Sequence, residues 1–307
     1  MNFTALINAM PGAVAQGLIW GILAIGVFIT YKVLDLADLT VDGTMATGGA
    51  VCIMLMLNGC NLWLALLCAM IAGMLAGFMT GLFHTAMGIP AILAGILTQL
   101  SLYSINLVIM GKANQGINVT KYALIVSQRS VRELSLQNPI IITALFTLAV
   151  ILVLYWFFGT ELGCSLRATG ANEAMSRAQG INTNFSKILG LMISNSIVAL
   201  SSAMLSHYQG FVDVNMGRGA IVIGLAAVII SDVLFGRLFH NFALKLFAVS
   251  IGSVIYYIVI QIVLWLGLNT DLLKLLSALI VAVFLAIPFW RSKLMSKGSQ
   301  RGGKQRA

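Results

Sequence analysis

Long apolar segments alternate with short polar ones along almost the whole chain. Nine apolar segments are candidates for the helices of roughly 20 residues that cross the hydrocarbon core of a bilayer, and the second of them, 44–57, is short. The pattern predicts an all-α polytopic membrane protein with about nine transmembrane helices, within a range of eight to ten. The expected spans are 13–34, 44–57, 62–83, 91–110, 139–158, 188–208, 219–234, 247–266 and 272–290.

The first polar interruption, at residues 35–43, carries three carboxylates between two apolar segments. An ionised carboxylate in hydrocarbon is costly, so this segment must lie at an interface, in a protein-lined cavity, or against Lys32 and helix N-termini. One interpretation is a cytoplasmic turn. The other is an irregular break, formed by Asp38, Thr40 and Asp42, that positions the second span beside a pathway. A half-helix at this break would change the number of spans by one.

Two later spans carry polar side chains at helical spacing. Gln99 and Asn106 are seven residues apart, two helical turns, and therefore share one face. Asn195 and Ser202 have the same spacing in the span 188–208. Polar side chains inside a span usually face other helices or water. These faces are candidate walls of a translocation path, and hydrogen bonds between helices alone would explain them equally well.

The longest polar segment in the middle of the chain, 159–187, lies between two apolar spans. It contains a short stretch that can form a capped helix. Asn172 is a suitable N-cap, and Glu173 follows at the positive end of the helix dipole. Arg177 lies four residues after Glu173, and Gly180 can end the helix in a left-handed conformation. We expect this segment to present a short helix to a partner in water.

Composition places the chain in a membrane. It is 60% hydrophobic and 9% charged, with a mean hydropathy of +0.99, whereas soluble domains carry about 25% charged residues. We expect one transmembrane domain, 1–290, followed by a basic cytoplasmic tail, 291–307, which holds six of the eighteen lysines and arginines. The net charge of +9 therefore indicates contact with anionic lipid and not with nucleic acid. The four cysteines have no metal-ligand spacing.

The distribution of basic residues predicts an orientation. With the segment 159–187 in the cytoplasm, twelve lysines and arginines fall inside and six fall outside. The positive-inside rule is then obeyed with the N-terminus outside and the C-terminus cytoplasmic. Four of the outside charges lie in one loop, 111–138, which alternates weakly and could form a short strand or an interfacial helix. The outside residues are Lys112, Lys121, Arg129, Arg132, Arg218 and Lys274.

Several motifs resemble one known family. Arg167-Ala-Thr-Gly-Ala-Asn172 and Gly180-Ile-Asn182 resemble the coupling loop of permease subunits of bacterial ABC importers of the branched-chain amino acid and ribose type. The nearest subgroup is thought to import tryptophan, tyrosine or related compounds. Further segments that resemble this subgroup, in the same order, are 38–43, 89–97, 104–111 and 217–232.

The resemblance implies a type II ABC importer-like bundle in a bacterial plasma membrane. The chain would work as a homodimer, and an extracytoplasmic substrate-binding protein or lipoprotein would deliver the solute. Each copy would offer its loop to one ATPase subunit, which would bind ATP and Mg²⁺. ATP binding would close the ATPases and switch the bundle between outward and inward access. The coupling residues implied by this resemblance are Arg167, Gly170, Asn172, Glu173, Gly180 and Ile181.

The chain lacks a Walker A motif, because Gly111-Lys112 has neither the upstream glycine spacing nor a following Ser or Thr. No catalytic triad, metal cluster or carboxylate pair indicates an enzyme. An aromatic amino acid follows as substrate from the subgroup resemblance alone. A rival class is a secondary transporter driven by an ion gradient, with Asp38, Asp42 and Asp232 as proton or sodium sites. We expect Asp232 to pair with Arg237.

Overall fold

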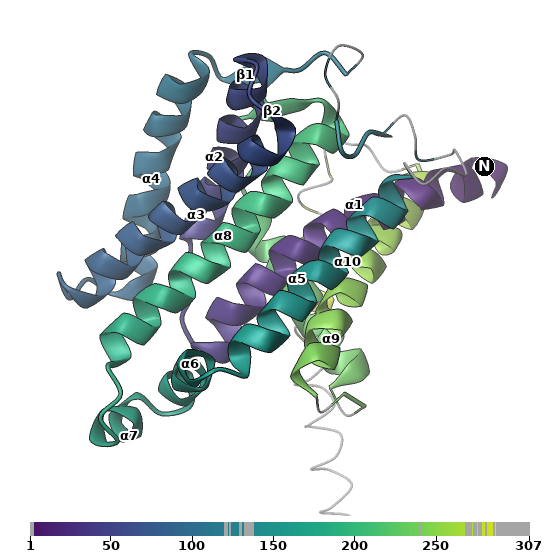
Figure 1. Cartoon of the computed structure of the whole chain (residues 1–307). Helices are drawn as coiled ribbons and strands as arrows, with labels where there is room; N and C mark the ends of the chain where they lie inside the picture. Colours follow the sequence, from purple (N-terminus) through teal and green to yellow (C-terminus); the bar gives the residue numbers. More distant parts are fainter. Residues whose placement is uncertain are drawn as a thin grey trace, which may run out of the picture.

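The computed structural model is a bundle of long helices with two short strands (Figure 1). It describes residues 3–119, 138–236 and 241–267, with a few positions between 122 and 131, at 238–239 and between 272 and 286. A π-helical turn, η1 (Ile29–Val33), continues the first helix. The helices are α1 (Phe3–Phe28), α2 (Thr40–Leu57), α3 (Leu62–Thr85), α4 (Ala91–Met110), α5 (Pro139–Phe158), α6 (Glu161–Ala171), α7 (Glu173–Ala178), α8 (Thr183–Gln209), α9 (Ala220–Phe235) and α10 (Phe242–Trp265).

The described helices agree with the predicted spans. Seven of them are long and apolar enough to cross a membrane, and α9, with 16 residues, is a shorter apolar helix. These eight correspond to the first eight predicted spans, and α1, α2, α8 and α10 each begin earlier than the apolar pattern indicates. The ninth predicted span, 272–290, lies largely outside the described residues, and the basic tail, 291–307, lies entirely outside them.

The helices form two groups that meet along α1 and α8. In one group α2 and α3 pack with α8 and α4 packs on α2 and α3, and in the other α5, α9 and α10 pack with α1. Figure 1 shows these groups side by side. Gly73 and Gly77 of α3 lie against the backbone of α8, where any Cβ atom would collide with a carbonyl oxygen. Small residues at this spacing permit such close contact.

The helical structure is interrupted between η1 and α2, and this break lies beside the middle of α8. The carboxylate of Asp38 accepts a hydrogen bond of 2.7 Å from Asn195, near the middle of the 27-residue helix. Its other oxygen accepts the backbone N–H of Thr40 at 2.9 Å, which caps the start of α2. Asp38 is buried, which favours the irregular break over an exposed turn. Thr40 and Asp42, predicted within the break, lie instead in the first turn of α2, because this cap starts the helix before them.

A short antiparallel ribbon crosses the end of the bundle opposite α6 and α7 (Figure 1). Its strands are β1 (Asn114–Gly116) and β2 (Phe211–Asp213), with Gln115 opposite Val212. A strand was predicted as one alternative for the loop 111–138, whereas no strand was predicted at 211–213. Pairing between segments almost 100 residues apart leaves little signal in either segment alone.

Candidate functional site

Helix α7 forms as its sequence predicts. The side-chain oxygen of Asn172 accepts the backbone N–H of Met175 at 2.9 Å and caps the helix. Arg177 forms an ion pair of 2.5 Å with Glu173, one turn earlier. Gly180 follows the last turn with φ of 82°, in the left-handed region that glycine adopts without strain. The predicted capped helix is therefore confirmed.

A further lysine ties α7 to α8. The Nζ atom of Lys187 lies 2.8 Å from the same Glu173 oxygen that Arg177 contacts. Arg177 also donates a hydrogen bond of 2.9 Å from Nε to the hydroxyl of Thr183, the first residue of α8. Ile181, between the helices, donates its N–H to the carbonyl of Ser176 at 3.0 Å. These contacts fix α7 to the start of α8.

The charge on Glu173 is stabilised by these contacts. The hydrogen bond from Lys187 is the main reason that the pKa of Glu173 is lowered from its ordinary value of 4.5. Partial burial opposes this shift, and the charges of Lys187 and Arg177 add to it. Sequence spacing predicted the pair with Arg177, but a pair between residues 173 and 187 depends on how the intervening turn folds.

Helix α6 packs on the end of η1. Gly170 lies so close to the Val33 carbonyl oxygen that any Cβ atom at residue 170 would collide with it. The Leu166 side chain, one turn earlier, is fully buried. The guanidinium of Arg167 lies over the ring of Phe242 in α10, 5.9 Å from its centroid. A displacement of α6 would therefore act directly on the ends of α1 and α10.

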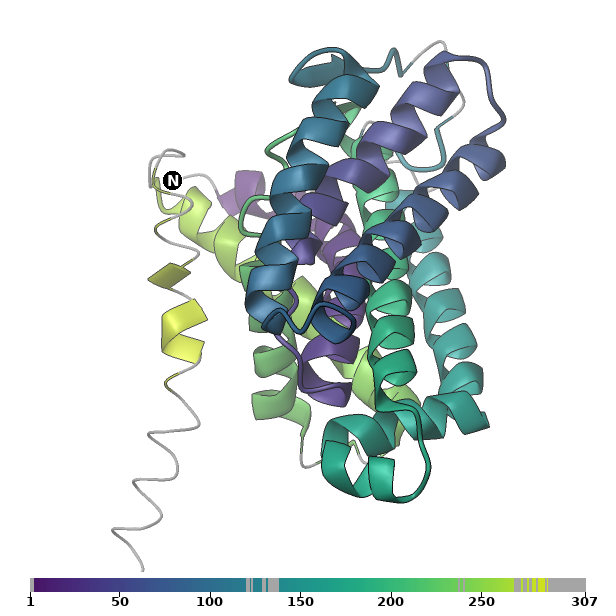
Figure 2. The same cartoon turned by 90° about the vertical axis from the view of Figure 1, so that its left-hand side faces the viewer.

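The outer side of this loop is free of contacts with the bundle. Helices α6 and α7 project beyond the ends of the long helices (Figures 1 and 2). Asn172, Arg177 and Gly180 are exposed. Two apolar side chains are exposed among them, Met175 at 63% and Phe185 at 51%. Both side chains are available to contact a partner protein.

Three of the six candidate path residues, Asp38, Thr40 and Asn195, lie in a buried polar network around the start of α2. Asn195 donates to Asp38 and accepts a hydrogen bond of 2.7 Å from Thr44 in α2. The hydroxyl of Thr40 lies 2.6 Å from that of Thr80 in α3, within the same buried region. These bonds connect α2, α3 and α8, so every one of these polar groups has a partner within the protein.

Ser202 also joins two helices. Its hydroxyl donates to the backbone carbonyl of Met45 in α2 and accepts the N–H of Gly49 at 3.0 Å. The side chain is fully buried between α8 and α2. For Ser202 and Asn195 the structure therefore displays hydrogen bonds between helices, and a role in a translocation path stays a prediction.

Gln99 and Asn106 share a face, as predicted, and that face lines a cavity of about 290 Å³. Asp42 of α2 and Arg218, just before α9, line the same cavity. Asn106 is fully buried, and neither atom of its amide has a hydrogen-bond partner among the described residues. Leaving a buried polar group unpaired costs about 1–3 kcal/mol. A ligand or water that pairs with this amide would recover that free energy.

Asp42 lies against a helix N-terminus, one of the alternatives predicted for the segment 35–43, and Asp232 has a partner that was not predicted. The carboxylate of Asp42 accepts the backbone N–H groups of Gly219 and Ile221, each at 3.0 Å, and so caps α9 from another helix. Asp232, near the end of α9, pairs with Lys32 at 2.6 Å. The predicted pair of Asp232 with Arg237 stays a prediction, because Arg237 lies outside the described residues. Lys32 reaches Asp232 because the end of η1 lies beside the end of α9.

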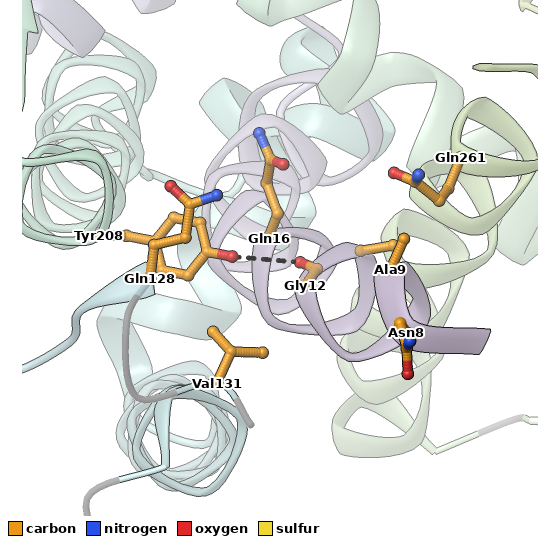
Figure 3. A pocket seen from close by; sticks show the side chains of 9 residues that line it. Asn8, Ala9, Gly12, Gln16, Gln128, Val131, Tyr208 and Gln261 are labelled. Carbon is orange, nitrogen blue, oxygen red and sulfur yellow. Dashed lines mark hydrogen bonds between the residues drawn. The ribbon is translucent and has the colours of Figure 1, made fainter. Parts of the chain in front are cut away.

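A larger cavity, of about 450 Å³, lies near the start of α1. Figure 3 shows the carboxamides of Gln16, Gln128 and Gln261 around it, with the Tyr208 hydroxyl directed at the carbonyl of Gly12. Sequence analysis missed this cavity, because its lining comes from four separate parts of the chain. It carries no charged group among its described lining residues.

The fold defines a class, a polytopic helical membrane protein. A sequence profile described as "Branched-chain amino acid transport system / permease component" matches residues 10–287. The chain belongs to this ABC-type importer permease family, as its motifs predicted. It is therefore a multi-pass inner-membrane protein and a transporter subunit.

Individual relatives agree with this assignment. The chain is 38% identical over 279 residues to the tyrosine transport system permease protein of Clostridioides difficile, covering 91% of both chains. It is 25% identical to the fructose import permease protein FruF of Bifidobacterium longum, covering 80% of this chain and 68% of that protein. The solved structure of PsaBC from Streptococcus pneumoniae in complex with Fab has a similar fold, with a TM-score of 0.53 at 17% identity over 94% of this chain and 95% of that one.

Proposed function

We propose that this chain is the permease of an ATP-driven importer that moves a small solute into the cytoplasm. A separate ATPase subunit binds ATP and Mg²⁺ and docks on the exposed helix α7. A second copy of the chain completes the bundle, and an extracytoplasmic binding protein delivers the solute. The observation that carries this proposal is the exposed helix α7. The ion pair of its Glu173 with Lys187 fixes it to α8. The preceding helix α6 is joined to the bundle by the close contact of Gly170 with Val33.

The proposed coupling follows from these contacts. A movement of the ATPase displaces α7, and the ion pairs of Glu173 pass that displacement to α8. The close contact of Gly170 with Val33 passes it to η1 and α1. Since α1 and α8 are the helices along which the two groups meet, the loop acts on the junction of the bundle.

The substrate proposed is an aromatic amino acid such as tyrosine or tryptophan. The support is the 38% identity to a permease named for tyrosine transport. The ion-driven alternative has less support, because two of its three carboxylates are paired with side chains of the protein: Asp38 with Asn195 and Asp232 with Lys32.

The proposal predicts that Glu173→Arg detaches the ATPase or abolishes coupling without unfolding the permease. The reversed charge repels Arg177 and Lys187, so α7 loses its fixed position. The measurement is the amount of ATPase that co-purifies with tagged permease from its native membrane. Glu161→Arg, an exposed charge reversal at the start of α6, is the matched control. Equal ATPase recovery and normal transport with Glu173→Arg would contradict the proposed coupling surface.

A further inference from the structure

The cavity lined by Gln99 and Asn106 lies where two helices begin inside the bundle. α2 starts at Thr40, beside the middle of α8, and extends toward β2. α9 starts next to Asp42, two residues into α2, and extends toward Lys32 at the opposite end. Transporters commonly place their substrate sites at such interrupted helices.

The amide of Asn106 indicates that this cavity holds a polar ligand. Asn106 is fully buried and lines the cavity, and both its donor and its acceptor lack a partner among the described residues. Gln99 adds a second amide two turns earlier on the same helix. Asn195, in contrast, uses its amide fully in bonds to Asp38 and Thr44. Asn106 is therefore a polar residue of the predicted path that is left available to a solute.

The charges around the cavity are opposite in sign. Asp42 supplies a carboxylate and Arg218 a guanidinium, and these two do not form an ion pair with each other. Each carboxylate oxygen of Asp42 accepts one backbone N–H and keeps further acceptor capacity. A ligand that carries one negative and one positive group matches this arrangement better than an uncharged sugar does.

Size and apolar lining restrict the ligand further. The cavity volume of about 290 Å³ lies at the small end of ligand pockets, which run from roughly 300 to 1,000 Å³. Leu100 and Tyr103 of α4 also line it, and both are exposed, at 63% and 41%. They provide an apolar and an aromatic surface at the edge of the cavity.

We infer that this cavity is a recognition site for a single zwitterionic α-amino acid on its way through the permease. Arg218 binds the carboxylate, Asp42 receives the ammonium group, and the Asn106 amide pairs with one of the polar groups of the solute. The side chain of the amino acid packs against Leu100 and Tyr103. The inference rests on the proposed importer function, and it assigns the chemical class of the solute to residues of this chain.

Protection of an introduced cysteine tests this site directly. Leu100→Cys, in a chain whose native cysteines are replaced by serine, is labelled with a water-soluble maleimide in the purified permease–ATPase complex. L-tyrosine should slow labelling about twofold when its concentration equals its Kd, because one bound site reduces access by the factor 1 + [L]/Kd. Tyramine lacks the carboxylate and 3-(4-hydroxyphenyl)propionate lacks the ammonium group, so both should protect much less. Ser101→Cys, exposed on α4 outside the cavity, should show no protection.

Substitution of the charged lining separates this inference from the proposed function. Arg218→Gln should abolish protection by L-tyrosine, whereas Lys112→Gln, an exposed cation outside the cavity, should leave it unchanged. No labelling of Leu100→Cys, protection by ribose alone, or equal protection by all three aromatic probes would overturn the amino-acid site. If the complex still couples ATP hydrolysis to uptake, each of these results leaves the proposed importer function intact. A permease that transports without any ATPase would instead overturn the proposed function.

Discussion

Glu173 is the residue on which the position of α7 depends most. It accepts contacts from Arg177 in its own helix and from Lys187 in the next one. Exposed ion pairs contribute little singly, typically about 0.2–1 kcal/mol, but a shared carboxylate with two partners restrains both segments at once. The Lys187 side chain is only 13% exposed, so this pair is less screened by solvent than the pair with Arg177.

The pKa of Glu173 provides a test at this scale. Lys187→Gln removes the largest cause of the lowered value, so the pKa should rise toward 4.5. Because the folded pKa lies below the unfolded one, the ion pairs stabilise the loop above about pH 4.5 and are lost as the pH falls through the folded pKa. NMR titration of the Glu173 carboxyl carbon in detergent-solubilised wild type and variant measures both effects.

Glu161→Gln provides the control for this titration, since Glu161 forms no ion pair with a described residue. It should leave the pKa of Glu173 unchanged. Indistinguishable titration curves for wild type and Lys187→Gln would contradict the contact between Lys187 and Glu173.

At the residue scale, local features were predictable and distant partners were not. Three local features depend only on neighbours within a few residues: the N-cap at Asn172, the ion pair of Glu173 with Arg177, and the left-handed conformation of Gly180. The shared face of Gln99 and Asn106 follows equally from helical periodicity. The bond of Asp42 to the start of α9 joins positions 177 residues apart, so no spacing rule reveals it.

At the scale of elements, hydrophobicity located the long helices but not their exact starts. α2 begins four residues before the predicted span, because the Asp38 carboxylate caps Thr40 and the first turn is buried in a polar network. α8 likewise begins with the buried Thr183, which binds Arg177. Polar residues at these starts have protein partners, so they belong to the helices although they interrupt the apolar pattern.

Two helices, α2 and α9, begin inside the bundle and not at one of its ends. α2 and α9 both begin near Asp42 and extend toward opposite ends of the molecule. The sequence indicated a half-helix only at the first break, from its carboxylates. The second break, after β2, has no such cluster, and it is recognised only from its contact with Asp42.

At the scale of the whole molecule, the native cysteines can establish orientation in the membrane. Cys60 lies in the turn between α2 and α3, and Cys164 lies exposed in α6. If α6 and α7 are cytoplasmic, an impermeant maleimide should label a Cys60-only variant in intact cells and a Cys164-only variant only in inverted vesicles. A Cys52-only variant, buried in α2, should resist labelling in both. The reverse pattern for Cys60 and Cys164 would contradict the predicted orientation.

The energy source of transport tests the account as a whole. The measurement is uptake of L-tyrosine into proteoliposomes that contain the permease and its co-purifying ATPase, with the binding protein outside and ATP inside. The proposed importer function predicts uptake that requires ATP and the ATPase and persists without an ion gradient. This uptake should be lost with Glu173→Arg but not with Glu161→Arg. Uptake by the permease alone, driven by a proton or sodium gradient, would contradict it and would direct attention to Asp38, Asp42 and Asp232.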